Sequence, residues 1–168
     1  MTETISFDSA LWTSAASIMG LLVLSAFFSG SETALTAASR GKLRAQADRG
    51  SKGAERALRM TEDSERLIGS VLLGNNVVNI LAASLATAMF TRMFGESSVA
   101  LATLVMTLLV LIFAEVLPKT YAITNAEKTA ARVSPLIAVV IFLFSPIVGR
   151  GADFGARGLT PLWRANRP

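Results

Sequence analysis

The chain has 168 residues, 52% of them hydrophobic, and a formal net charge of +4 at pH 7. Its mean hydropathy of +0.52 indicates one membrane domain rather than a soluble core. The sequence contains no cysteine and no histidine, which excludes disulfides, thiolate or imidazole metal sites and cysteine nucleophiles. Any metal ion must therefore be held by oxygen atoms, which are the ligands of hard cations such as Mg²⁺, Ca²⁺ and Na⁺.

Three uncharged stretches are long enough to cross a bilayer, which takes roughly 17 to 25 helical residues. They occupy residues 9–31, 67–91 and 97–114. We expect an all-α membrane protein with three transmembrane helices per subunit and juxtamembrane, interfacial helices on the cytoplasmic side. The expected spans are about 10–33, 67–92 and 97–122.

A fourth apolar stretch, residues 133–149, is interrupted by Pro135 and Pro146. The apolar part between the two prolines is too short to span a bilayer. We therefore expect a helix over about 128–148 that lies at the membrane interface. A fourth span is the alternative.

Basic residues are distributed unevenly around these stretches. The N-terminal segment has Glu3 and Asp8 but no lysine or arginine, so it is a poor signal peptide and the first helix should be retained. Arginines and lysines crowd residues 40–66, whereas the turn between the second and third spans has only Arg92, balanced by Glu96. The positive-inside rule then places the N-terminus outside and the C-terminus in the cytoplasm, in a multi-pass protein of the inner or plasma membrane.

The basic segment combines its charges with a thin apolar face. We expect a helix over about 40–62 in the inner headgroup layer, where basic side chains meet anionic lipid. A solvated helical loop is the alternative. Nucleic-acid binding is not expected, because the positive charge sits where topology requires it and no aromatic residues interleave with it. We assign residues 1–150 to the transmembrane domain and residues 151–168, which lack periodicity, to a linker toward cytoplasmic domains.

Each expected span carries polar residues beside a helix-weakening residue. They are Ser29 with Gly30, then Gly74 with Asn75, Asn76 and Asn79, and finally Glu115 with Pro118. Polar side chains are costly in lipid and survive where they face one another, water or an ion. This pattern predicts the membrane part of an ion transporter.

Depth and spacing allow these groups to share one cavity. At about 1.5 Å of rise per residue, all three groups fall in the inner half of the membrane. Asn75 and Asn79 are four residues apart and share one helix face, as do Ser25 and Ser29. Carboxylate, amide and hydroxyl oxygens, together with backbone carbonyls, could supply the roughly six ligands that Mg²⁺ requires.

Helix breaks could supply the backbone carbonyls. Pro118 cannot donate a hydrogen bond to the carbonyl of Ala114. Gly30 and Gly74 could allow the local unwinding that many transporters use around a site at the membrane midplane. Glu32, near the inner end of the first span, either lines the cytoplasmic mouth or is a solvated boundary residue.

Simpler interpretations stand beside this one. Ser25 alone is better explained by interhelical hydrogen bonding, whereas Asn75, Asn79 and Glu115 together favour a cation site, because helix association rarely needs a buried acid. Lys119 could form an ion pair with Glu115, but we expect its side chain to extend to the inner headgroups.

Three motifs carry a resemblance to a known family. In order and spacing, FFSGSETAL (27–35), LLGNNVVN (72–79) and EVLPKTYA (115–122) resemble the transmembrane domain of the CorC/CorB and cyclin-M (CNNM) magnesium transporters. The resemblance covers roughly residues 10–150 and is specific because all three motifs occur together. It implies a homodimer of three-span subunits with a cytoplasmic belt of juxtamembrane helices. It also implies export of dehydrated Mg²⁺, driven in prokaryotic members by Na⁺ entry.

The same resemblance implies site residues. The ion ligands would be the Ser29 hydroxyl, the backbone around Gly30, the Asn75 and Asn79 amides and the Glu115 carboxylate. Pro118 would correspond to a kink in the third helix. From the residues themselves, we expect Ser25, Glu32, Gly74, Asn76 and Pro118 to line the pathway or kink a helix. Family members usually continue into cytoplasmic CBS modules that bind ATP, and we expect such modules in the full-length protein.

Two other classes of function are considered. A non-transporting membrane anchor or regulatory scaffold for cytoplasmic domains would fold normally but bind no Mg²⁺. An intramembrane enzyme is not expected, because the chain lacks histidine and cysteine and has no second buried acid near Glu115 to complete an acid–base pair.

Overall fold

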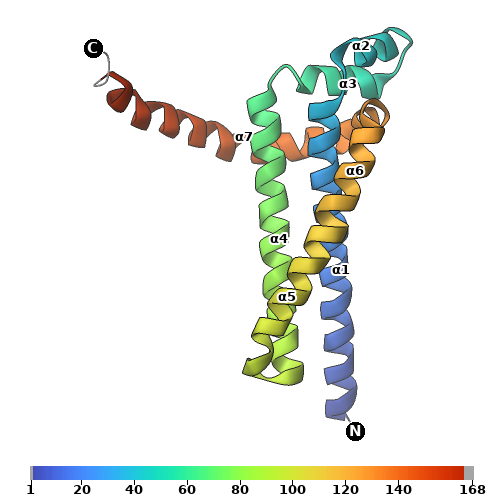
Figure 1. The fold of residues 1–168 in the computed structure, drawn as a ribbon, viewed down its shortest axis with the longest axis vertical. Helices are drawn as coiled ribbons and strands as arrows, with labels where there is room; N and C mark the ends of the chain where they lie inside the picture. The colour runs from blue at the N-terminus through green and yellow to red at the C-terminus, as the bar shows by residue number, and fades with distance from the viewer. Residues whose placement is uncertain (1, 165–168) are drawn as a thin grey trace.

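The computed structural model describes the backbone of residues 2–164 and the side chains of residues 9–148. Within these residues all regular structure is helical (Figure 1). Three long segments run side by side: α1 (Thr2–Ala37), α4 (Ser64–Phe94), and a chain of helices made of α5 (Val99–Leu109), η2 (Val110–Val116) and α6 (Leu117–Thr124). The remaining elements are α2 (Arg40–Asp48), α3 (Lys52–Met60), the short turn η1 (Glu96–Ser98) and α7 (Ala126–Arg164).

The protein is a multi-pass membrane protein. Among the described residues, four helical stretches are long and apolar enough to cross a bilayer: Ser9–Ala37, Ser64–Phe94, Glu96–Thr124 and Ala126–Val148. The first three contain the spans expected at about 10–33, 67–92 and 97–122. The fourth belongs to α7, which runs across α1 and α4 rather than beside them (Figure 1). This direction favours the interfacial placement that we expected for residues 128–148.

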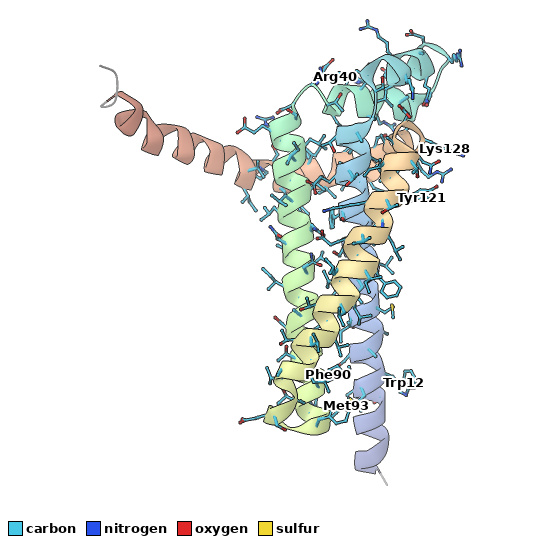
Figure 2. All side chains as sticks on the ribbon, viewed as in Figure 1. Trp12, Arg40, Phe90, Met93, Tyr121 and Lys128 are labelled. Carbon is cyan, nitrogen blue, oxygen red and sulfur yellow. The ribbon has the colours of Figure 1, made fainter. Side chains whose placement is uncertain are left out.

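The two ends of the bundle differ in chemistry. Arg40 and Lys128 lie at the end that carries α2 and α3, whereas Trp12, Phe90 and Met93 lie toward the opposite end (Figure 2). The Trp12 side chain is 74% exposed, as is typical of aromatic residues at a membrane boundary.

Small residues allow the long helices to approach closely. Ala82 and Ala86 of α4, Ala102 of α5 and Ala114 of η2 are all completely buried. The outward faces instead carry large apolar side chains, such as the 65% exposed Ile80. In a membrane this arrangement is stable, because lipid solvates the large side chains while the small ones let helices pack.

Local sequence explains where α4 begins and ends. The Asp63 carboxylate accepts a hydrogen bond from the backbone N–H of Arg66 at 3.3 Å and so caps the N-terminus. At the other end Gly95 adopts a φ of 82°, a conformation that favours glycine and terminates helices. The Ser98 hydroxyl then donates to the carbonyls of Phe90 and Gly95 and fixes the turn into α5.

The expected single helix over 40–62 is instead two short helices, α2 and α3. The break falls at Gly50, which has a φ of 92°, and the Ser51 hydroxyl then caps α3 by accepting from the Ala54 N–H. Leu43, Ala54 and Ala57 are completely buried. The thin apolar face of this segment therefore packs on the protein.

The helix α3 crosses α7 in direct backbone contact. A Cβ added to Gly53 would overlap the carbonyl oxygen of Ala131, so only glycine fits there. The Ser134 hydroxyl donates to the Gly53 carbonyl at 3.0 Å and ties the two helices together. Glu127, at the start of α7, adds an ion pair with Lys42 at 3.2 Å.

The backbone of α7 continues as a helix through residues 151–164 and projects beyond α4 (Figure 1). We expected this region to be a linker, and that role stays a prediction. Residues 165–168 lie outside the described part of the chain.

We predict that Gly53→Ala destabilises the protein. The added methyl group must separate α3 from α7, and overpacking of this kind costs about 1 to 3 kcal/mol. Thermal unfolding in detergent measures the effect. The matched control is Gly41→Ala in α2, where the added Cβ would meet only the Ser39 hydroxyl oxygen at 3.9 Å. An unfolding temperature as high for Gly53→Ala as for Gly41→Ala would contradict the close crossing.

Candidate cation site

Three oxygen atoms converge between α1 and α4. The Ser25 hydroxyl oxygen lies 2.9 Å from Oδ1 of Asn75 and 2.7 Å from Oδ1 of Asn79. Ser25 is completely buried and Asn75 is 6% exposed. A hydroxyl has one proton and can donate it to only one amide oxygen at a time. The two amide oxygens therefore share a single hydroxyl proton, and one of them is free to accept from another group or to bind a cation.

Asn79 also faces a cavity of about 380 Å³ between α4 and the α5–η2 segment. The carboxylate-bearing Glu115 lines the same cavity, together with Thr87, Thr103 and Thr107. The rest of the wall is largely apolar, with Met106 among its residues. The Asn79 amide thus connects the Ser25 cluster to the space that Glu115 borders.

Glu115 does not stand alone. Its Oε2 atom accepts a hydrogen bond from Nζ of Lys119 at 2.9 Å, and the Glu115 side chain is 31% exposed. Our expectation that Lys119 extends to the headgroups is wrong, and the ion pair that we considered as the alternative is formed. The two residues are four apart and so lie on one face of the helix. Within an apolar bundle, pairing lowers the cost of both charges.

A π-helical segment carries Glu115. The segment η2 covers Val110–Val116 and ends two residues before Pro118. Proline lacks an N–H and its ring clashes with the carbonyl four residues earlier, so an ordinary α-helical turn is strained there. Widening the helix relieves this strain, and such bulges are frequent at functional sites. The expected distortion near Pro118 thus takes the form of a π-helix upstream of the proline.

The glycines of the motifs permit close packing. A Cβ on Gly30 would lie 3.3 Å from Cβ of Pro118, and one on Gly74 would lie 2.9 Å from the ring of Phe28. Both α1 and α4 are continuous through these positions, so neither helix is unwound at its glycine, contrary to our expectation. The glycines instead let α1 pack closely against α6 and α4, at α1 residues that follow Ser25.

The family of the chain can now be stated. Residues 16–152 match the family model described as the cyclin M transmembrane N-terminal domain. The chain belongs to the cyclin M family. The resemblance inferred from the three motifs is therefore confirmed.

One named relative of this CNNM domain is an inner membrane protein. The chain is 46% identical over 125 residues to the UPF0053 inner membrane protein YfjD of Escherichia coli, and 40% identical over 127 residues to a UPF0053 protein of Haemophilus influenzae. These alignments cover 74% and 76% of this chain. It is also 32% identical over 144 residues, 78% of this chain, to the polyamine export protein of Salmonella typhimurium. The chain spans only 29%, 30% and 32% of these three relatives, which are much longer proteins.

Not every residue that we predicted for the site joins the cluster. Ser29 is completely buried, but its hydroxyl has no hydrogen-bond partner among the described residues. Asn76 is exposed on the outside of α4, and Glu32 is half-buried near the end of α1. The serine that contacts the asparagines is Ser25, which we had placed in the pathway or in interhelical hydrogen bonding.

We predict that Ser25→Ala and Ser29→Ala differ in stability. Losing the Ser25 hydroxyl removes an interhelical hydrogen bond, and such bonds contribute about 0.6 to 1.7 kcal/mol in membrane proteins. Losing the unpartnered Ser29 hydroxyl should leave the free energy of unfolding unchanged or slightly raised. Chemical or thermal unfolding of the two CNNM variants in detergent provides the comparison. Equal effects would contradict the role of Ser25 as the bridging hydroxyl.

Proposed function

We propose that this domain exports a hard divalent cation, Mg²⁺, across the membrane. The observation that carries the proposal is an oxygen cluster between two membrane helices, beside a cavity that a carboxylate on a third helix also lines. Ser25 of α1 contacts both asparagines of α4, and Asn79 shares a cavity with Glu115 of η2. We further propose three spans per subunit, with α7 at the inner interface, and an N-terminus outside.

The chemistry of these groups suits Mg²⁺ as the transported substrate. The ion prefers about six oxygen ligands at roughly 2.0 to 2.1 Å and gives up its waters reluctantly. The hydroxyl of Ser25, the amide oxygens of Asn75 and Asn79 and the carboxylate of Glu115 could replace part of its water shell. No group of three or more acidic side chains that could hold a metal occurs among the described residues. A site built from one carboxylate and neutral oxygens binds weakly enough to release its ion, as transport requires.

Lys119 sets a condition on the proposal. Its ammonium group pairs with the Glu115 carboxylate at 2.9 Å, which is the simpler interpretation that we considered for this acid. A cation that binds Glu115 must therefore displace the Lys119 ammonium group. Na⁺ could bind the same oxygens as the coupling ion.

We also propose that two copies of the chain form a homodimer. The greater length of the relatives leaves room for cytoplasmic modules of the CBS type.

A polyamine is the second candidate substrate. One relative is named a polyamine export protein. In this chain, the Glu115 carboxylate already binds an alkylammonium group, that of Lys119. The largely apolar wall of the adjoining cavity would suit the methylene chain of a polyamine. The domain would then select an elongated organic cation rather than a bare metal ion.

We predict that Glu115→Gln abolishes transport of the true substrate. Loss of the carboxylate removes the charge that compensates the cation, and the rate of flux should fall by about tenfold or more, since removing an ion's only charged ligand costs more than roughly 1.4 kcal/mol. Mg²⁺ flux into liposomes containing the purified protein can be followed with an entrapped fluorescent indicator. The matched control is Glu65→Gln, which removes an exposed acid from the first turn of α4.

The outcomes separate the candidates. Mg²⁺ flux that Glu115→Gln abolishes and Glu65→Gln preserves supports Mg²⁺ export. Flux of radiolabelled spermidine with the same dependence on Glu115, and none of Mg²⁺, favours the polyamine. A well-folded protein that carries neither would refute both proposals and leave the role of membrane anchor or regulatory scaffold, without catalysis.

A further inference from the structure

A second pocket lies where α3, α4 and α7 meet, and its lining residue Leu67 is about two turns before Asn75 on α4. Its volume is about 280 Å³, and the side chains of three arginines line it, Arg56, Arg59 and Arg66. Asp63 is the one acidic residue in its lining. The remaining lining residues are Met60, Leu67 and Ile141. The lining of the pocket therefore combines an excess of positive charge with apolar side chains.

The arginines are available to a ligand. Arg56 is exposed and has no hydrogen-bond or ion-pair partner among the described residues. Arg59 pairs with Glu55 at 2.8 Å, and Arg66 pairs with Asp63 at 3.4 Å. The side chains in these two pairs are all more than half exposed, and exposed pairs contribute little. An anion with several oxygens can compete for the guanidinium groups, which are well suited to phosphate.

The pocket lies on the boundary between charged and apolar sequence. Its arginines belong to the charged segment, whereas Leu67 is the first residue of the uncharged stretch 67–91. Ile141 lies on the apolar half of α7, and its neighbours Phe142 and Leu143 are 83% and 65% exposed. A ligand that fits must therefore be anionic at one end and apolar at the other. That description fits a phospholipid and does not fit a free phosphate or a nucleotide.

Packing of α7 against α4 shapes this pocket. A Cβ on Gly69 would come within 2.8 Å of a methyl group of Val148, so glycine lets α7 lie directly on α4 about two turns beyond Ile141. The volume of the pocket is slightly below that of pockets for drug-sized ligands, which start at about 300 Å³. It can hold a headgroup phosphate while the acyl chains lie outside, along α7.

We propose that the pocket formed by Arg56, Arg59, Arg66, Leu67 and Ile141 is a specific binding site for the phosphate headgroup of an anionic phospholipid. The lipid would bridge α3, α4 and α7 and hold α7 at the membrane interface. This site is separate from the oxygen cluster at Ser25. It stands whether or not the domain transports an ion.

The test measures binding of phosphatidylglycerol to the purified, delipidated protein in detergent. Native mass spectrometry counts bound lipid, and thermal unfolding reports stabilisation by a short-chain phosphatidylglycerol. We expect the affinity to fall by about fivefold for each arginine replaced by glutamine, as for the loss of one basic residue at an anionic surface. Arg56→Gln is the decisive single variant, because it breaks no ion pair within the protein. Phosphatidylcholine should bind to no measurable extent.

The control carries the same loss of charge at another place. The triple variant Arg44→Gln, Arg49→Gln, Lys52→Gln removes three basic residues that do not line the pocket. It should bind phosphatidylglycerol like the unchanged protein, whereas the variant Arg56→Gln, Arg59→Gln, Arg66→Gln should not. Equal losses in the two triple variants would show diffuse attraction and overturn the proposal. Equal stabilisation by inorganic phosphate would also overturn it, because the ligand would then be a soluble anion.

Discussion

The arrangement of the transmembrane helices depends on satisfying polar groups where no water is available. Ser25 lies between Asn75 and Asn79, and an unpartnered amide in lipid would cost several kcal/mol. This contact aligns α1 with α4. The packing of Gly74 under Phe28 and of Gly30 against Pro118 then follows, because the helices must come close for the hydroxyl to reach both amides. The oxygen atoms that hold α1 against α4 are thus the same ones that we propose bind a cation.

Much of the fold could be predicted from the sequence. The long helices follow from the lengths of their uncharged stretches, and the shared face of Asn75 and Asn79 follows from their spacing. Spacing alone could not distinguish Ser25 from Ser29, since both lie on one face and differ by a single helical turn. The choice depends on the relative height of α1 and α4, which the packing of Phe28 on Gly74 sets. That contact links residues distant in sequence.

Other features could be predicted from the sequence only in part. The pairing of Lys119 with Glu115 depends on the apolar surroundings of both groups, which make pairing better than extension toward distant headgroups. The π-helix could have been suspected from Pro118, whose missing N–H demands some distortion, but its extent could not. The break at Gly50 was visible as a glycine beside Ser51, a strong capping residue. The close contact between Gly53 and Ala131 could not be predicted, because no pattern in the neighbouring sequence indicates it.

The direct backbone contact at Gly53 has a mechanical consequence. The helix α7 contacts α1, α3 and α4. Because Gly53 leaves no free space where α3 crosses α7, α7 is held rigidly against these helices. A torque on its far end would reach the helices of Ser25 and Asn75 without first being absorbed by a loop. A movement of α7 is thereby coupled mechanically to α1 and α4.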